Sequence, residues 1–162
     1  MSEINHTTTN NFNGNIDLSA LRRQRFTIDG DPNRVLELNT TDLTIIQRLS
    51  EAYPKLEELE HEVGNVSQGV GSTEDTVKDD IDTMATRLSD TDKKMRELLD
   101  YIFDSNVSEM CAPSGSMYDP IGGQLRYEHI ITILMGLYEN NLAEEMKRVQ
   151  NRFKSHTAKY TG

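Results

Sequence analysis

The most regular pattern of apolar positions lies between residues 77 and 102. These positions alternate steps of four and three residues, only one of them is polar, and the residues between them are mostly charged or polar. A narrow stripe over nearly four heptads is typical of a coiled-coil seam, so a second helix must cover it. The stripe consists of Val77, Ile81, Met84, Leu88, Thr91, Met95, Leu98 and Ile102.

A second apolar run predicts a final helix over residues 125–153. Its first half is broadly apolar, whereas its second half has a narrow apolar stripe among basic residues. The heptad helix can pair with this helix or with a copy of itself, and the pattern leaves both open. The late-helix residues that we expect to face a partner are Leu134, Leu137, Leu142, Met146, Val149, Phe153, Arg152 and Lys154.

Alternating apolar residues near the N-terminus predict a β-hairpin. Residues 25–28 and 34–38 flank a turn-rich segment, and Phe26 and Ile28 would share one face, with Val35 or Leu36 opposite. A lone hairpin is marginal in water, so it must pack against a helix or another chain.

The segment after the hairpin predicts a helix that starts at residues 39–42, where side-chain oxygens can accept from the first amides. Pro54 lies within its apolar stripe, and we expect a break or kink near Tyr53. Glycines at residues 64–71 then predict a linker.

The segment 104–124 combines prolines and glycines with apolar residues. A loop with this content is expected to pack over the helices or to become ordered on binding. The fold class is therefore mainly α, with an N-terminal β-hairpin followed by three or four helices, one with a coiled-coil-like heptad seam. The predicted organisation is a disordered arm at 1–16, a hairpin and helix at 17–63, a linker at 64–73, and a helical region with a basic tail at 74–162.

Composition and charge narrow the function classes. Hydrophobic residues make up 35% of the 162 residues and Trp is absent, which predicts a thin core. The net charge of −10 argues against nucleic-acid binding, which needs clustered Lys and Arg. Residues 147–162 nevertheless hold five basic residues and no acidic one. They either complement the dipole at a helix end or contact an acidic partner.

The sequence contains no catalytic or metal-binding signature. The four histidines lie far apart, and Cys111 is the single cysteine, which is typical of a reducing compartment and leaves no internal disulfide. We therefore predict no enzyme activity and no cofactor. With no apolar leader segment and no run of about 18 apolar residues, the sequence predicts a soluble, intracellular protein that does not bind membranes.

A family resemblance adds a biological setting. The strings FTIDGDPNRVLELN at 26–39, LSEAYPKLEEL at 49–59 and HTAKYT at 156–161 resemble small, uncharacterised tail-region proteins of phages and prophages of Gram-positive bacteria. That group resembles tail assembly chaperones, which bind the helical tape measure protein and keep it soluble.

The resemblance implies a non-enzymatic assembly chaperone in the cytoplasm of the bacterial host, with the tape measure or another tail protein as its partner. The alternative is a structural tail or head–tail subunit of the virion, joined to neighbouring copies through its arm and hairpin. Self-association is left open. In the first interpretation the seam would bind the partner, through Val77, Ile81, Met84, Leu88, Met95, Leu98 and Ile102, together with the late-helix residues named above.

Overall fold

The computed structural model describes residues 14–18, 23–66 and 74–161; nearly all of the predicted N-terminal arm therefore lies outside the described residues. The described part is mainly helical, with an antiparallel hairpin followed by four helices, as the sequence predicted. The elements in chain order are β1 (Gln24–Ile28), β2 (Asp31–Leu38), α2 (Thr44–Val66), α3 (Glu74–Phe103), α4 (Val107–Cys111), β3 (Pro120–Ile121), β4 (Gln124–Leu125) and α5 (Arg126–Thr161).

The hairpin turns through Asp29 and Gly30, which both have positive φ angles of 53° and 72°. Positive φ at both turn residues matches the right-handed twist of the strands, which explains an Asp-Gly pair here. The register places Phe26 opposite Leu36 and so decides between the two predicted partners. Leu36 and Leu38 are fully buried, because β2 lies against α4 and the core.

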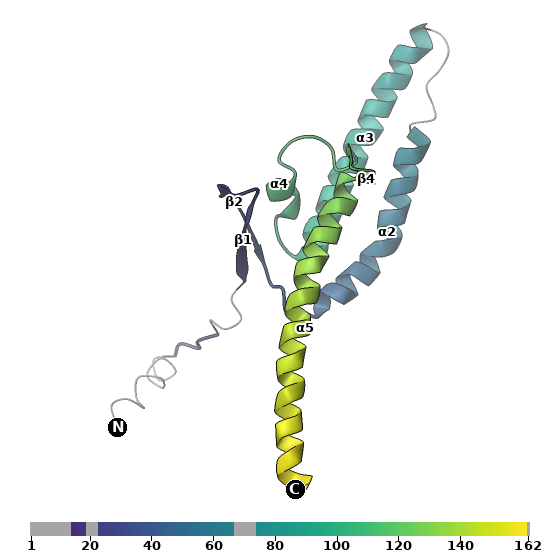
Figure 1. The fold of residues 1–162 in the computed structure, drawn as a ribbon. Helices are drawn as coiled ribbons and strands as arrows, with labels where there is room; N and C mark the ends of the chain where they lie inside the picture. The colour runs from purple at the N-terminus through teal and green to yellow at the C-terminus, as the bar shows by residue number, and fades with distance from the viewer. Residues whose placement is uncertain (1–13, 19–22, 67–73, 162) are drawn as a thin grey trace.

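Helix α2 begins at Thr44, directly after the capping segment predicted at residues 39–42. Asp42 accepts hydrogen bonds from the amide and the hydroxyl of Thr44, at 2.9 and 2.6 Å, and so satisfies one free amide of the first turn. Pro54 does not end the helix, which continues to Val66 and changes direction along its length in Figure 1. The first three residues of the predicted linker are thus helical, and residues 67–73 lie outside the described part.

Helices α2 and α3 pack side by side and antiparallel (Figure 1). The Tyr101 hydroxyl near the end of α3 donates to Glu51 near the start of α2, at 2.7 Å. The helix beside α3 along this side is therefore α2, which was not one of the two partners predicted from the sequence.

Helix α5 completes the core with its first half. Tyr138 stacks at a tilt on Phe103 of α3, with ring centroids 5.9 Å apart, and both side chains are fully buried. The second half of α5 extends away from the other helices as a projecting rod (Figure 1). The helix continues to Thr161, eight residues beyond the predicted end.

The predicted loop at 104–124 packs over the helices, which was one of its two predicted states. It contains α4 and the small β3–β4 hairpin, and Val107 and Met117 in it are fully buried. Arg96 of α3 donates to three backbone carbonyls of this segment, those of Ser108, Ala112 and Gly115, at 2.8 to 3.2 Å. The same segment leads directly into α5.

Candidate partner-binding site

The heptad stripe of α3 is divided into two parts. The stripe residues from Thr91 to Ile102 form a covered part, and those from Ile81 to Leu88 form a less covered part, the bare part. Thr91, Met95, Leu98 and Ile102 are at most 8% exposed and belong to the chain's own core. Ile81 is 52% exposed. Met84 and Leu88 are half-buried, and the side chain of Val77 lies outside the described residues.

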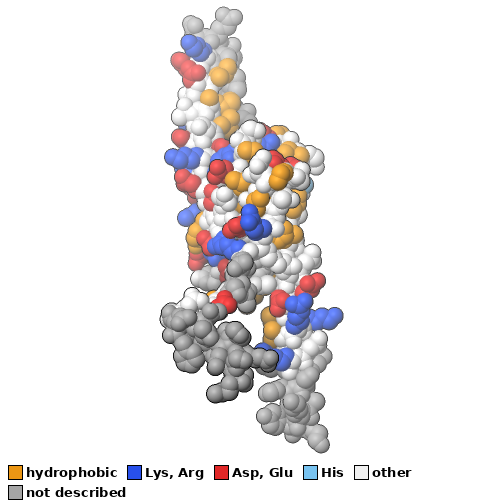
Figure 2. Space-filling model, turned by 90° about the vertical axis from the view of Figure 1, so that its left-hand side faces the viewer, with side chains coloured by type: hydrophobic (Ala, Val, Ile, Leu, Met, Phe, Trp, Pro, Cys, Tyr) orange, Lys and Arg blue, Asp and Glu red, His pale blue; other side chains and the backbone are white. Residues whose placement is uncertain are grey.

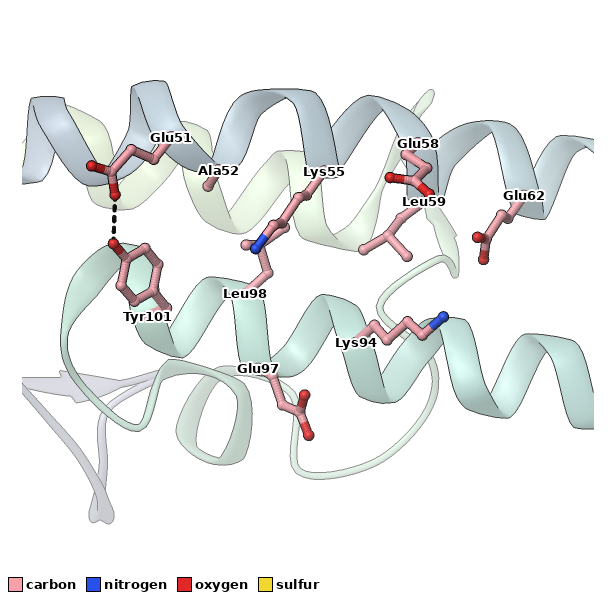
Figure 3. Close-up of a pocket in the computed structure, with 10 residues that line it drawn as sticks. All are labelled: Glu51, Ala52, Lys55, Glu58, Leu59, Glu62, Lys94, Glu97, Leu98 and Tyr101. Atoms are coloured by element: carbon pink, nitrogen blue, oxygen red, sulfur yellow. Dashed lines mark hydrogen bonds between the residues drawn. The ribbon is translucent and has the colours of Figure 1, made fainter.

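The division follows from where α2 ends. Glu62, one turn before the end of α2 at Val66, lies across the α2–α3 groove from Lys94 (Figure 3). The first turns of α3 therefore extend beyond the end of α2, as Figure 1 shows. A coiled-coil stripe without a neighbouring helix leaves apolar side chains in water, which is unfavourable unless a partner covers them.

The covered part of α3 has a wider apolar face than the heptad pattern indicated. Leu99 and Phe103 are as deeply buried as the stripe residues beside them. Here the helix is enclosed by α2, α4 and α5, whereas a seam would contact one helix only. Met95, Leu98 and Ile102, named as partner-binding from the sequence, are thus occupied within the chain.

The late-helix residues do not form one surface. Leu134 is buried in the core, and Leu137 and Leu142 pack partly against it. Met146 is 44% exposed on the projecting half, where Val149 is half-buried. Arg152 is exposed, and the side chains of Phe153 and Lys154 lie outside the described residues.

A groove between α2 and α5 was not predicted. Its apolar lining is formed by Leu49, Tyr53 and Leu56 of α2 and by Ile131 of α5, and its volume is about 400 Å³. Three carboxylates also line it, those of Glu57, Glu60 and Glu128. The sequence pattern placed the apolar residues on a core-facing stripe, but Tyr53 is 58% exposed, because α5 covers only part of this face.

A second groove, between α2 and α3, has a volume of about 480 Å³ and is shown in Figure 3. Ala52, Leu59 and Leu98 line it, with four glutamates and with Lys55 and Lys94 from opposite helices. The four glutamates outnumber the two lysines, so the groove carries a net negative charge that the lysines only reduce.

Cys111 and His129 carry side-chain types that serve in nucleophilic and acid–base chemistry. Burial raises the pKa of the Cys111 thiol to about 11, which keeps it protonated and unreactive near neutral pH. His129 is exposed and lies 3.3 Å from Gln124. Within the described ranges, no group of three or more His, Cys, Asp or Glu residues is placed to hold a metal ion.

Two tyrosines link the α2–α5 groove to the core. Tyr118 and Tyr127 pack edge to face, with centroids 5.6 Å apart. Burial, and then the nearby charges of Glu60 and Glu128, raise the pKa of Tyr127. Side-chain hydrogen bonding to the same two carboxylates raises the pKa of Tyr127 further.

None of the helices searched, which covers the described residues only, is long and apolar enough to cross a membrane. Comparisons with known proteins add no relative: no family model, no curated protein and no solved structure matches this chain.

Proposed function

We propose that this chain is a non-enzymatic, assembly-chaperone-like protein that binds helices of a phage tape measure protein. The observation that carries the proposal is the bare start of the α3 stripe, where Ile81 is 52% exposed beyond the end of α2. The resemblance to phage tail-region proteins supplies the setting.

The bare part of α3 has the features of a helix-docking face. Ile81, Met84 and Leu88 follow the three- and four-residue steps that allow a second helix to pack alongside. Met84 contributes a flexible thioether, which adapts to partner helices of different sequence. A tape measure helix with an exposed apolar stripe would cover this face and would itself be shielded from aggregation.

Co-expression with the tape measure protein tests the proposal. We expect the chain to increase the soluble fraction of the tape measure protein and to co-purify with it. The double variant Ile81→Asp with Met84→Asp should abolish both effects, because it places charges in the interface. The matched control is Thr83→Asp with Thr86→Asp, which adds the same charges to the opposite face of the same turns. Equal solubility of the tape measure protein with and without the chain would refute the proposal.

A structural role in the virion is the second candidate, and the hairpin favours it. Within the described residues the sheet has two strands, so the outer edge of β1 has no strand beside it. Such an edge can pair with a strand of a neighbouring copy. Mass spectrometry of purified particles separates the two roles, because a chaperone is absent from finished tails and a subunit is present in fixed stoichiometry.

A further inference from the structure

We infer that the α2–α5 groove binds a basic amphipathic helix of a partner protein. This groove is separate from the start of α3, so the inference goes beyond the proposed function and does not depend on it. It rests on two features of the groove: an apolar row that continues into water, and carboxylates that need a cationic occupant.

The apolar part of the groove has the spacing that receives one face of a helix. Its row on α2 follows steps of three, four and three residues: Ile46, Leu49, Tyr53 and Leu56. Ile131 contributes to the apolar lining from α5. Ile46 and Tyr53 are both 58% exposed, so the row extends one turn beyond the groove. At about 1.5 Å per residue the row is about 15 Å long, which matches nearly three turns of a docked helix.

The charged side chains in the lining of this groove are all acidic. Glu57 and Glu60 line it from α2 and Glu128 from α5, and none of the described residues in the lining is basic. The α2–α3 groove differs, because its lining includes lysines as well as glutamates. The face shown in Figure 2 differs too, since acidic and basic side chains lie intermixed on it. The α2–α5 groove therefore offers negative charge to an occupant.

Two of these carboxylates share one hydroxyl donor. Side-chain hydrogen bonding links the buried Tyr127 to both Glu60 and Glu128, but a tyrosine hydroxyl has one proton and donates to one carboxylate at a time. The backbone amide of Leu125 also donates to Glu128, at 3.4 Å. A helix laid over the groove removes water from the carboxylates, which is costly unless the helix brings Lys or Arg. The charge thus selects a basic helix over an acidic one.

Binding of designed helical peptides to the full chain, measured by fluorescence anisotropy, tests the inference. The probe is a labelled peptide with a stripe of Leu and flanks of Lys. Two matched peptides carry Glu in place of Lys, or Ala in place of Leu. We expect the Leu/Lys peptide to bind and the matched peptides to bind at least about tenfold more weakly, because one is repelled and the other lacks apolar contacts.

Variants of the chain locate the binding site. The groove variant Glu57→Gln with Glu60→Gln should weaken binding of the Leu/Lys peptide at least about tenfold. The control variant Glu58→Gln with Glu62→Gln changes the net charge equally in the α2–α3 groove and should change binding less than about twofold. Tyr53→Ser should weaken binding about tenfold without unfolding the chain, since this side chain is 58% exposed.

Four results would overturn the inference. The first is no binding of the Leu/Lys peptide at about 200 µM. The second is an equal loss in the groove and control variants, since the peptide would then respond only to the overall negative charge. The third is loss of binding in Ile81→Asp with Met84→Asp but not in the groove variant, because the peptide would then occupy the start of α3. The fourth is self-association of the chain that the groove variant abolishes, because a second copy would then be the occupant.

Discussion

Arg96 offers the sharpest test of how the chain holds its central segment in place. Its guanidinium donates to Asp92 at 2.8 Å and to the carbonyls of Ser108 and Ala112 at 3.2 and 2.8 Å. A further bond goes to the carbonyl of Gly115, at 2.8 Å. One side chain on α3 thus satisfies acceptors along the whole first half of the segment that connects α3 to α5.

Replacing Arg96 by Met keeps an apolar stem similar to that of Arg and removes all four bonds. The Gly115 carbonyl is in an exposed residue and can bond to water instead, so we count the Asp92 pair and the two carbonyls of buried residues. At about 1 kcal/mol each, with the side chain only partly exposed, the expected loss is about 3 kcal/mol. For a chain of this size that corresponds to about 6–12 °C in Tm.

The assays are thermal and urea unfolding, with thermolysin cleavage between residues 104 and 125 as a local readout. Arg96→Lys should lie between wild type and Arg96→Met, because an ammonium cannot reproduce the fork of the guanidinium. Arg87→Met is the matched control, since Arg87 is exposed on the opposite face of α3 and should change Tm little. A fall in Tm of less than about 2 °C for Arg96→Met would refute the argument that these bonds hold the segment.

The other predictions concern single side chains. Tyr118 has the one buried side-chain polar atom in the described residues without a hydrogen-bond partner, so Tyr118→Phe should leave the unfolding free energy unchanged or raise it by up to about 1 kcal/mol. The raised pKa of Cys111, about 11 against an ordinary 9, should slow alkylation at pH 8 about 100-fold relative to the urea-unfolded chain, and the rate should rise towards pH 11. Leu98→Asp should unfold the protein, whereas Ile81→Asp should leave its melting temperature within about 2 °C, because only Leu98 lies in the core. Equal effects of these two substitutions in differential scanning calorimetry would contradict the division of the α3 stripe.

The fold class could be predicted from the sequence because its signals are local. The Asp29-Gly30 turn, the capping oxygen of Asp42 and the heptad spacing on α3 each act within a few residues. Pro54 shows the limit of such signals: of the predicted break or kink, the break does not occur, whereas α2 does change direction along its length (Figure 1). The burial of α2 against the neighbouring helices outweighed the local preference of Pro54 to end the helix.

The candidate sites were harder to predict, because burial depends on which helix lies alongside. Ile81 and Leu98 belong to one apolar stripe, yet they are 52% and 8% exposed. No feature of the residues themselves separates them; what differs is that α2 runs beside one and ends before the other. The α2–α5 groove has the same origin, since Tyr53 and Ile131 meet only after both helices are packed.

A thin core and long helices are two consequences of the same composition. With few large apolar residues, the packed region can enclose only part of each long helix, so the start of α3 and the end of α5 must project. The two projections differ in charge: the start of α3 is acidic, and the end of α5 is basic. Opposite charge at the two projections favours contacts of basic segments with acidic surfaces, and the start of α3 is itself such a surface. The partner helix proposed for the start of α3 would therefore gain from basic residues beside its own apolar stripe.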